Sequence, residues 1–458
     1  MRIAFGTNSY VHRSLPLSAQ RMVNCYLEAA PPSAKTFAAV PQIYGIRQLA
    51  TVGDSYLRGG IVRNGIPYVV AGETLYKLAA TGVATALGSV PGYGYVDMAG
   101  DEENIMLVSR GRGWYWNGIT VQEIADEDFP GAEWVENLDG YYIVGAVGSG
   151  KFYISSNRNP AEWDGLGFAS AEKYPDDLVS GIVANGEIYL FGKESFEVWF
   201  NSGDPDFPLE RSSAGFGDIG CLSRFGTAKA DNSVFFLGHD GVIYRLNGYQ
   251  PQRVSTHAIE QAIEDYADKT CYAQSFNEGG HKFVAFTFDD NTWVYDIATQ
   301  LWHERVSFNL PNWRPLFILR AFDMWIVGDF YTNTIGVLDP NMFAEFGETL
   351  RCSATSPPVS EDNKRVTSSR LELVFEQGVG LPVGQGADPK IMLRWSDTGG
   401  RKWSSEHWRS FGKIGEYTKR AVWNRLGQAR DRVYEYAISD PVRRTLILAT
   451  TDATPDMT

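Results

Sequence analysis

Short apolar runs alternate with polar residues along most of the chain, and glycine-containing turns separate them. Runs rich in Tyr, Trp and Val lie on either side of Gly, Asn or Asp, the residue types that supply the positive φ of tight hairpin turns. Seven such hairpins are predicted, at 64–78, 104–118, 139–156, 185–200, 232–246, 280–296 and 323–338. The pattern predicts an all-β protein.

The hairpins recur at a regular interval. Their first residues are separated by 35 to 48 positions. A four-stranded unit that repeats at this interval is the sequence signature of a propeller blade. Because a single blade cannot bury both faces of its sheet, the blades must pack around a common axis. We therefore predict a β-propeller of six or seven blades over residues 46–345, preceded by an N-terminal extension, 1–45.

Two features depart from the hairpin pattern. Residues 255–268 predict a helix, because a Ser or Thr cap precedes apolar positions at helical spacing. Residues 346–362, with Ser-Pro-Pro at 356–358, are typical of a linker. A small β-sandwich-like domain is predicted over 363–458, where four alternating runs follow the linker, at 370–375, 390–395, 433–438 and 444–448.

Composition and charge limit the function. The chain has 458 residues, of which 44% are hydrophobic, and this excludes bulk disorder. The net charge of −14 is uneven: residues 1–360 hold 25 Lys and Arg against 42 Asp and Glu, and residues 361–458 hold 16 against 13. An acidic body argues against binding nucleic acid through phosphate neutralisation, although a repulsive wall would let DNA slide past. The Arg-rich end is either a solvated surface or a protein-facing one.

The sequence predicts a soluble protein kept in a cytosol or released by a route other than secretion. No apolar run approaches the ~20 residues of a membrane helix, so stable membrane insertion is not expected. The first residues lack the apolar core of a signal peptide. The four cysteines, at 25, 221, 271 and 352, have no short spacing, and we expect reduced, structural thiols rather than zinc ligands or a disulfide framework.

Candidate chemistry is sparse. The common nucleophile, phosphate-loop and zinc-protease motifs are missing, and the acid pairs 176–177 and 289–290 are typical of turns. Six histidines show no metal-ligand spacing: His12, His239, His257, His281, His303 and His407. We predict no catalytic, metal-binding or cofactor-binding residue, no cofactor and no enzymatic activity.

One stretch resembles the Asp box that many sialidases carry, S-x-D-x-G-x-T-W. Ser396, Gly400 and Trp403 match, whereas Thr398 replaces the Asp and Lys402 replaces the Thr. The Asp box is a structural hairpin, so it carries no catalytic weight.

Aromatic residues are abundant, with 13 Trp and 23 Tyr. Their alternation along strands favours packing between blades, although aromatics could also line a sugar-binding groove. Hairpin aromatics such as Trp114 and Trp116 could instead be exposed and serve a protein interface.

Five strings point to a family. Residues 18–28, Ser-Ala-Gln-Arg-Met-Val-Asn-Cys-Tyr-Leu-Glu, resemble the opening Q-R-x-V-N-x-Y-x-E of a bacteriophage family. Strings that resemble the same family follow in collinear order, at 196–211, 241–260, 425–433 and 438–442. The chain is thus similar, from about residue 10 to 445, to the packaged-DNA stabilisation protein, or tail hub (nozzle), of short-tailed bacteriophages.

The resemblance implies a virion tail component assembled in the bacterial host cytoplasm. Members of this family are expected to form a hexameric ring below the portal and its adaptor ring, to retain the packaged genome and to form part of the DNA exit channel. Tail needle and tailspike proteins would attach nearby, and DNA would pass without sequence-specific binding. The family offers no catalytic residues. The alternatives left open are a propeller glycosidase and a polysaccharide-binding tail component.

Overall fold

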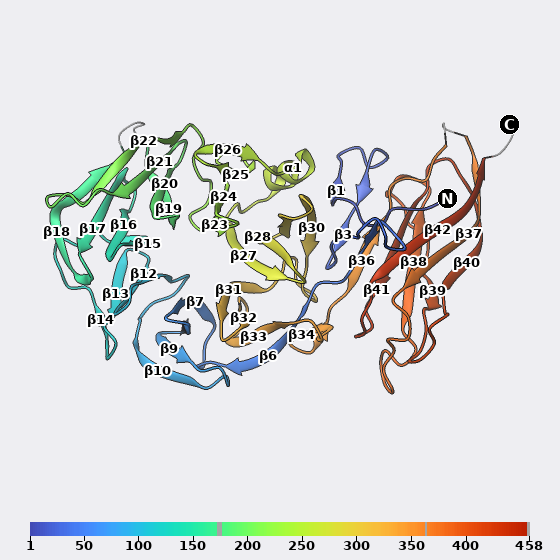
Figure 1. The fold of residues 1–458 in the computed structure, drawn as a ribbon, viewed down its shortest axis with the longest axis horizontal. Helices are drawn as coiled ribbons and strands as arrows, with labels where there is room; N and C mark the ends of the chain where they lie inside the picture. The colour runs from blue at the N-terminus through green and yellow to red at the C-terminus, as the bar shows by residue number, and fades with distance from the viewer. Residues whose placement is uncertain (172–175, 362–363, 456–458) are drawn as a thin grey trace.

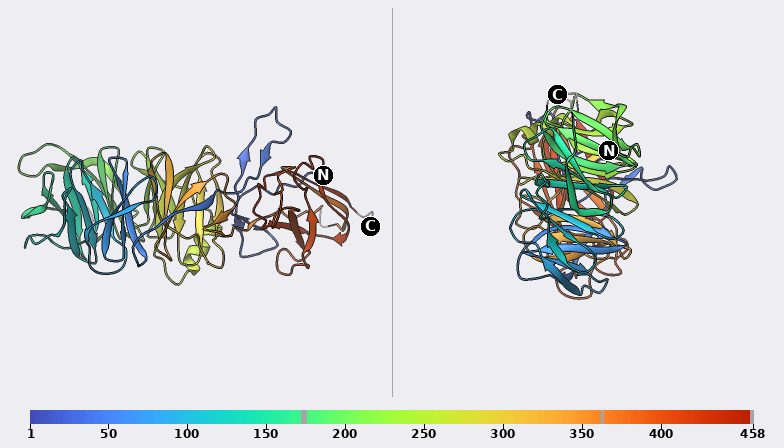
Figure 2. Two further views of the ribbon diagram at one scale, coloured as in Figure 1. Left: turned by 90° about the horizontal axis from the view of Figure 1, so that it is seen from below. Right: turned by 90° about the vertical axis from the view of Figure 1, so that its left-hand side faces the viewer.

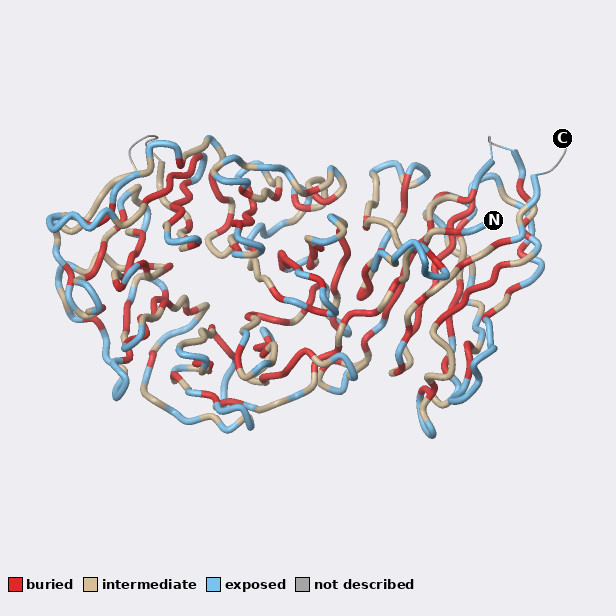
Figure 3. Tube along the Cα trace, in the orientation of Figure 1, coloured by how far each residue is buried: buried red, intermediate tan, exposed pale blue. Residues whose placement is uncertain are grey.

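The computed structural model describes residues 1–171, 176–361 and 364–455. The molecule is elongated, with a β-propeller at one end and a β-sandwich at the other (Figures 1 and 2). Buried strand segments run through both bodies, whereas most of the loops that connect them are exposed (Figure 3). The predicted all-β class and two-part architecture are confirmed.

The propeller consists of four-stranded antiparallel sheets, each built from consecutive hairpins. Blade one consists of β7 (Leu57–Arg63), β8 (Ile66–Ala71), β9 (Thr74–Leu78) and β10 (Ala84–Ser89). Blade two consists of β11 (Asp97–Gly100), β12 (Ile105–Ser109), β13 (Arg112–Trp116) and β14 (Val121–Glu123). Blade three consists of β15 (Ala132–Leu138), β16 (Tyr141–Ala146), β17 (Lys151–Ser156) and β18 (Asn159–Ser170). Blade four consists of β19 (Leu178–Ala184), β20 (Glu187–Gly192), β21 (Phe196–Asn201) and β22 (Leu209–Gly217). Blade five consists of β23 (Thr227–Ala230), β24 (Ser233–Leu237), β25 (Ile243–Asn247) and β26 (Gln250–Arg253).

Blades six and seven complete the ring. Blade six is β27 (Tyr272–Glu278), β28 (His281–Thr287), β29 (Thr292–Asp296) and β30 (Leu301–Arg305), and blade seven is β31 (Pro315–Ala321), β32 (Met324–Asp329), β33 (Thr334–Asp339) and β6 (Gly45–Thr51). The innermost strands, β7, β11, β15, β19, β23, β27 and β31, contact one another in a closed circle. The described residues therefore form seven blades, and each predicted hairpin supplies the second and third strands of one blade.

The ring is closed by a strand from the opposite end of the propeller sequence. β6 pairs antiparallel with β33, with Thr51 opposite Thr334 and Gly45 opposite Asp339. Blade seven thus takes three strands from the end of the repeat and one from its beginning. The hydrogen bonds of β6 join the two ends of the propeller, and the backbone bond from Leu57 N–H to the Thr332 carbonyl adds to them.

Apolar side chains fill the spaces between neighbouring blades. Trp114 and Trp116 are 2% and 7% exposed, and they pack with Tyr68 and Val70 of blade one. The alternative that these two tryptophans are exposed for a protein interface is therefore wrong. They alternate with the half-buried Tyr115 along β13, so both point into the same interblade core.

One helix interrupts the strands, as predicted. α1 (His257–Asp265) follows β26 and precedes β27, so it lies between blades five and six. Ile259 and Ile263 are fully buried and join an apolar cluster with Phe286 and Trp302 of blade six. Their spacing of four residues places both on one face of the helix.

The sandwich contains two facing sheets. One includes β36 (Cys352–Thr355), β41 (Val433–Ile438), β38 (Lys390–Ser396) and β39 (His407–Ser410), and the other includes β40 (Ala421–Ala429), β37 (Val366–Phe375) and β42 (Leu446–Pro455). Their inner faces share one apolar cluster, which includes Leu371, Trp423 and Tyr436. Ile3 and Phe5 join the same cluster, so the N-terminal residues complete the sandwich core.

The N-terminal extension connects the two bodies. It contains β1 (Tyr10–Val11), β2 (Ala19–Gln20), β3 (Met22–Val23), β4 (Glu28–Ala29) and β5 (Ala38–Ala39). β3 pairs parallel with β30 and antiparallel with β36, so the sheet of blade six continues into the sandwich as one nine-stranded sheet.

The segment expected to be a linker also contains strands. β35 (Glu348–Thr349) and β36 both lie within residues 346–362. β35 pairs with β34 (Ala344–Glu345), which directly precedes this segment. β36 is hydrogen-bonded to β41, so the sandwich sheet begins before residue 363. The predicted boundary at 362–363 lies outside the described residues, and the other domain boundaries stay predictions.

Two further expectations concern the cysteines and the membrane. All four cysteines are buried and free, as predicted. In the described part of the chain, no helix combines the length and apolar character required to cross a bilayer.

Candidate functional site: the propeller axis and the domain junction

Aromatic rings meet at one end of the propeller axis. Tyr95 precedes β11 of blade two, Phe225 precedes β23 of blade five, and Tyr272 begins β27 of blade six. The Tyr95 and Phe225 ring centroids are 4.3 Å apart, and the Tyr272 centroid lies 5.4 Å and 5.5 Å from them. Blades two and five stand on opposite sides of a seven-bladed ring. The three rings therefore contact one another across the axis at this end of the propeller.

Ionisable side chains also connect blades around the axis. Arg224 of blade five forms an ion pair with Glu133 of blade three. Asp97 of blade two accepts a hydrogen bond from the backbone N–H of Val135 in blade three, at 3.0 Å. Glu136 likewise accepts from the backbone of blade four. These side chains bridge neighbouring or opposite inner strands.

Two carboxyl groups at the axis, those of Asp97 and Glu136, are poorly solvated. Burial raises the pKa of Asp97 to about 6 and that of Glu136 to about 7, and the field of Lys229 opposes the rise at Glu136. A glycosidase would also hold two acids in a propeller axis. Here, however, both acids hydrogen-bond to the backbone of the next blade, and aromatic rings close one end of the axis. The geometry therefore favours a structural role for both carboxyl groups.

A hollow of about 630 Å³ lies beside the axis, between blades three, four and five. Its charged residues include acids and bases in equal number: Glu133, Asp177, Asp268, Lys193, Arg224 and Lys269. Two of the bases are paired within the hollow, Arg224 with Glu133 and Lys193 with Asp177, the latter at 2.6 Å. In the described residues, no three His, Cys, Asp or Glu side chains gather as metal ligands would.

The histidines have local structural roles, and His281 and His303 lie near each other, because both pack on the Tyr26 ring. His239 Nδ1 accepts the backbone N–H of Gly220 at 3.2 Å, and His281 Nδ1 contacts Asp296 at 2.8 Å. His303 is buried, and its burial, reinforced by nearby Arg305, holds its pKa well below the usual range. The other three contact nearby residues: His12, His257 and His407.

The acid pairs and the Asp-box-like stretch are turn structures. Asp289 and Asp290 occupy the exposed turn between β28 and β29. Asp176 accepts backbone N–H groups of the turn that contains Glu194, at 2.6 Å.

In the Asp-box-like turn, the hydroxyl groups replace the missing carboxylate. Ser396 Oγ accepts the N–H of Gly400 at 2.9 Å, and Thr398 Oγ1 accepts that of Lys402 at 2.8 Å. Arg394 lies over the Trp403 ring at 4.7 Å.

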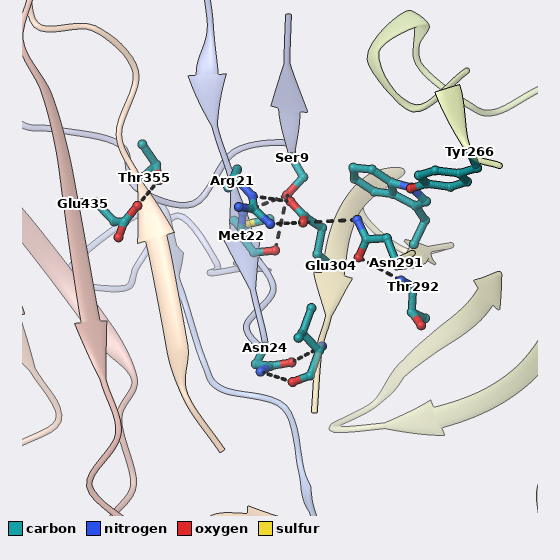
Figure 4. A network of polar contacts seen from close by, with 12 residues as sticks. Ser9, Arg21, Met22, Asn24, Tyr266, Asn291, Thr292, Glu304, Thr355 and Glu435 are labelled. Atoms are coloured by element: carbon teal, nitrogen blue, oxygen red, sulfur yellow. Dashed lines mark hydrogen bonds and ion pairs between the residues drawn. The ribbon is translucent and has the colours of Figure 1, made fainter. Parts of the chain in front are cut away.

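A network of polar contacts lies at the junction between propeller and sandwich (Figure 4). Arg21, which precedes β3, donates to both oxygens of Glu304 in β30, with an Nε–Oε1 distance of 3.0 Å. The Glu304 side chain is only 2% exposed, and it also accepts from Ser9 and Asn291, each at 3.3 Å. One carboxylate thus connects the N-terminal extension to β30 and to the turn between β28 and β29.

Asn24, three residues after Arg21, also connects the extension to blade six. Its φ of 56° lies in the left-handed region, which Asn tolerates better than most residues. Its amide nitrogen donates to the carbonyls of Val306 and Arg351, each at 2.8 Å, and its amide oxygen accepts the N–H of Val306 at 3.0 Å. Asn24 therefore ties the end of β30 to the segment that leads into the sandwich.

The junction explains the first family-like string. Within residues 18–28, Arg21 and Asn24 make the contacts above, and Tyr26 packs edge-on against His281 and Phe283 of blade six. The sequence contained this signal as a string of residues, but their roles depend on partners more than 250 positions away.

A buried ion pair, which no pattern in the sequence predicted, lies beneath the junction. Arg305 and Glu278 have fully buried side chains joined at 2.9 Å. The guanidinium carbon of Arg305 is 4.7 Å from the ring centroids of Phe276 and Trp313, and Glu278 also accepts the backbone N–H of Tyr44 at 2.8 Å. The pair therefore joins blade six to the extension, in a pocket of aromatic rings that stabilises the cation.

Solved structures show only a distant likeness. The computationally designed protein Ika8 is 14% identical, with a TM-score of 0.40, over 70% of this chain and 99% of Ika8. The extracellular domain of a one-component system from B. thetaiotaomicron is 9% identical, with a TM-score of 0.43, over 88% of this chain and 59% of that one. The N-terminal domain of Nup159 is 9% identical, with a TM-score of 0.40, over 70% and 99%.

Family models match nearly the whole chain. No curated protein matches in a sequence search. The model for the β-propeller of bacteriophage P22 Gp10 matches residues 8–343, and the model for the β-sandwich of the same protein matches residues 352–453. Both matches coincide with the two bodies of the structure and include the junction residues of the extension. The chain belongs to the bacteriophage P22 Gp10 family of tail hub proteins, which are structural proteins of the virion tail.

Proposed function

We propose that copies of this chain form a ring in the phage tail, and that the DNA exit channel runs between the copies rather than through any single propeller. The closed axis carries this proposal. Because the Tyr95, Phe225 and Tyr272 rings contact one another across the axis, DNA would have to pass outside the propeller. A channel enclosed by several subunits would retain the packaged genome and release it during ejection.

The elongated shape is compatible with such a ring. A closed ring of identical subunits needs head-to-tail interfaces, in which two different surfaces of the chain meet. The propeller and the sandwich lie at opposite ends of the molecule and offer two unlike surfaces (Figure 1). We infer a hexamer that joins the portal and adaptor ring above to the needle and tailspike proteins around it.

The charge distribution supports a channel that does not bind DNA. Residues 1–360 carry an excess of acidic side chains, and such a surface repels phosphates rather than neutralising them. We propose that part of this acidic surface faces the channel, where it would let DNA slide without sequence-specific contacts. DNA affinity should therefore be weak for the isolated chain and for the assembled ring.

The test is recruitment to a tail assembly. The purified chain is mixed with the portal–adaptor assembly of its phage, and the mass of the complex is measured by light scattering, with an unrelated propeller as the control. Binding of several copies, and none of the control, is the expected result and gives the stoichiometry. No recruitment at micromolar concentration would overturn the proposal and turn attention to a polysaccharide-cleavage screen.

A second experiment locates the channel. Phe225→Ala removes one of the three rings that close the axis, and the exposed Phe308→Ala serves as a matched substitution away from it. If DNA passes between copies, virions with either variant should retain and release their genome alike. A leak of DNA that is specific to Phe225→Ala would mean that the propeller axis itself is the conduit.

A further inference from the structure

Two buried thiols lie side by side where the extension meets the sandwich. Cys25 follows β3, and Cys352 begins β36, the strand that pairs antiparallel with β3 through Val23 and Ser353. Both cysteines are 0% exposed and belong to the same apolar cluster. The left-handed turn at Asn24 places Cys25 with its Sγ 3.4 Å from the carbonyl oxygen of Ser353 and within hydrogen-bonding reach of the Cys352 sulfur.

A buried cation without a carboxylate partner lies beside this pair. The Arg444 side chain is 0% exposed, and its guanidinium donates to two neutral carbonyl oxygens, those of Asp440 at 2.8 Å and Leu350 at 2.6 Å. The ion pairs identified in the described residues do not include Arg444, and its Nε has no hydrogen-bond partner there. A guanidinium stays protonated even when buried, so it needs a nearby negative charge.

The Cys25 and Cys352 thiols can supply that charge when one of them ionises. Both thiols interact electrostatically with Arg444, as does the carboxylate of Asp440. The hydrogen bond from Cys25, together with the field of Arg444, lowers the pKa of Cys352 in spite of its burial. The same hydrogen bond, together with burial, raises the pKa of Cys25. The two sulfurs thus differ, because the pKa of Cys352 is lowered and that of Cys25 is raised.

The other two cysteines provide a contrast within the same chain. Cys221 and Cys271 are also buried, at 1% and 0% exposure. Burial raises the pKa of Cys221 to about 12 and that of Cys271 well above the usual range. Because the thiolate is the reactive form of cysteine, these two should be inert, whereas Cys352 should react.

We propose that Cys25 and Cys352 are a redox-active pair that closes to a disulfide when the protein meets a peroxide. The Cys352 thiolate attacks one oxygen of hydrogen peroxide, the O–O bond breaks and hydroxide leaves, so that the sulfur becomes a sulfenic acid. The Cys25 sulfur then attacks the Cys352 sulfur, the S–O bond breaks, and the Cys25 proton leaves with the hydroxyl group as water. Both sulfurs are oxidised, and the peroxide supplies the two oxygens of the released hydroxide and water.

The disulfide would join the extension covalently to β36 and hence to the sandwich sheet. It would hold in place the strand that connects blade six to the sandwich. Its timing rests on the proposed function: the chain would fold as a reduced protein in the host cell and meet oxidants after the virion is released. The chemistry itself needs only the isolated chain, so it can fail or succeed independently of ring assembly.

The experiment uses the full chain, purified with a reductant and then exposed to hydrogen peroxide. The expected product has lost two hydrogens in its intact mass, and peptide mapping without reductant recovers a fragment that links Cys25 to Cys352. Cys221 and Cys271 should remain available to a thiol alkylating reagent after denaturation. Oxidation of Cys221 and Cys271 as fast as the proposed pair, or no cross-link in the folded protein, would overturn the proposal.

Variants test the role of the cation. Arg444→Met should slow the cross-linking about tenfold or more, because the thiolate fraction of Cys352 falls. Arg443→Met, at an adjacent residue whose side chain is 53% exposed, should leave the rate unchanged. Equal rates in both variants would show that the arginine does not activate the pair.

A measurement on the unmodified chain covers the case in which Arg444→Met does not fold. The rate of cross-linking is followed against pH and should level off below the ordinary thiol pKa of about 8.5. A rate that continues to rise through that value would contradict an ionised Cys352. Cys352→Ser should abolish the cross-link in either case.

Discussion

Replacing Arg21 by Ala removes the cation that faces Glu304 at the junction of propeller and sandwich, and we expect it to loosen that junction. Glu304 is 2% exposed and would keep its hydrogen bonds from Ser9 and Asn291 but lose both bonds from the guanidinium. Breaking a fully buried pair costs about 3–5 kcal/mol. Because the Arg21 side chain is 50% exposed, water can replace part of the lost interaction, and about 2–3 kcal/mol is expected.

Hydrogen exchange gives the appropriate measurement, because a chain with two bodies need not unfold in a single step. Backbone amides of residues 19–24 should exchange roughly 30- to 150-fold faster in Arg21→Ala than in the unmodified chain. Arg112→Ala is the matched control: its pair with Glu123 is 2.7 Å long but about half exposed on both sides, so less than about 1 kcal/mol is expected. Equal small effects in both variants would refute the argument that the burial of Glu304 makes its pair important.

A double substitution separates the charge from the packing. Glu304→Gln combined with Arg21→Ala leaves a neutral amide that can still accept from Ser9 and needs no cation. We expect this double variant to recover most of the protection that Arg21→Ala loses. If the double variant exchanges as fast as Arg21→Ala alone, the effect comes from lost side-chain packing rather than from the uncompensated carboxylate.

The remaining predictions concern the buried charges and the interblade core. Arg305→Met leaves Glu278 fully buried without its cation and should destabilise blade six by about 3–5 kcal/mol, measured by urea unfolding. Burial raises the pKa of Glu136 to about 7, so the folded chain holds a proton that the unfolded chain releases near pH 4.5. The melting temperature should therefore fall as the pH rises between these two values, and Glu136→Gln should make this fall smaller. Trp114→Ala should cost about 3–5 kcal/mol because the ring is 2% exposed, whereas Ile119→Ala, at 82% exposure, should change stability by less than about 0.5 kcal/mol.

Local pattern predicted the repeating part of the fold. A hairpin depends on alternation and turn residues that lie within about twenty positions of one another, so all seven hairpins and the helix with Ile259 and Ile263 could be read from the sequence. The alternation did not say which face of a strand meets another blade. The sequence therefore left open the prediction that Trp114 is exposed, and its packing against blade one excludes this prediction.

Long-range pairing could not be predicted in the same way. β6 closes the propeller against β33, and β3 lies between β30 and β36, but neither short strand carries any mark of its partner. The axial contact of Tyr95 with Phe225 likewise depends on which blades face each other across the ring. At the junction, the sequence showed only a family-like string of residues. The role of these residues became clear only from the structure, in which Arg21 donates to Glu304.

The position of β6 also determines when the molecule can be finished during synthesis. The ribosome makes residues 45–51 early, but their partner strand, 334–339, emerges almost 300 residues later. Phe5 waits longer still, because the sandwich core that receives it includes residues of β42. A chain that is cut short before residue 334 therefore retains an open propeller with β6 unpaired and an exposed N-terminal segment. Such a fragment would be visible to cellular proteases, and only full-length subunits would accumulate for tail assembly.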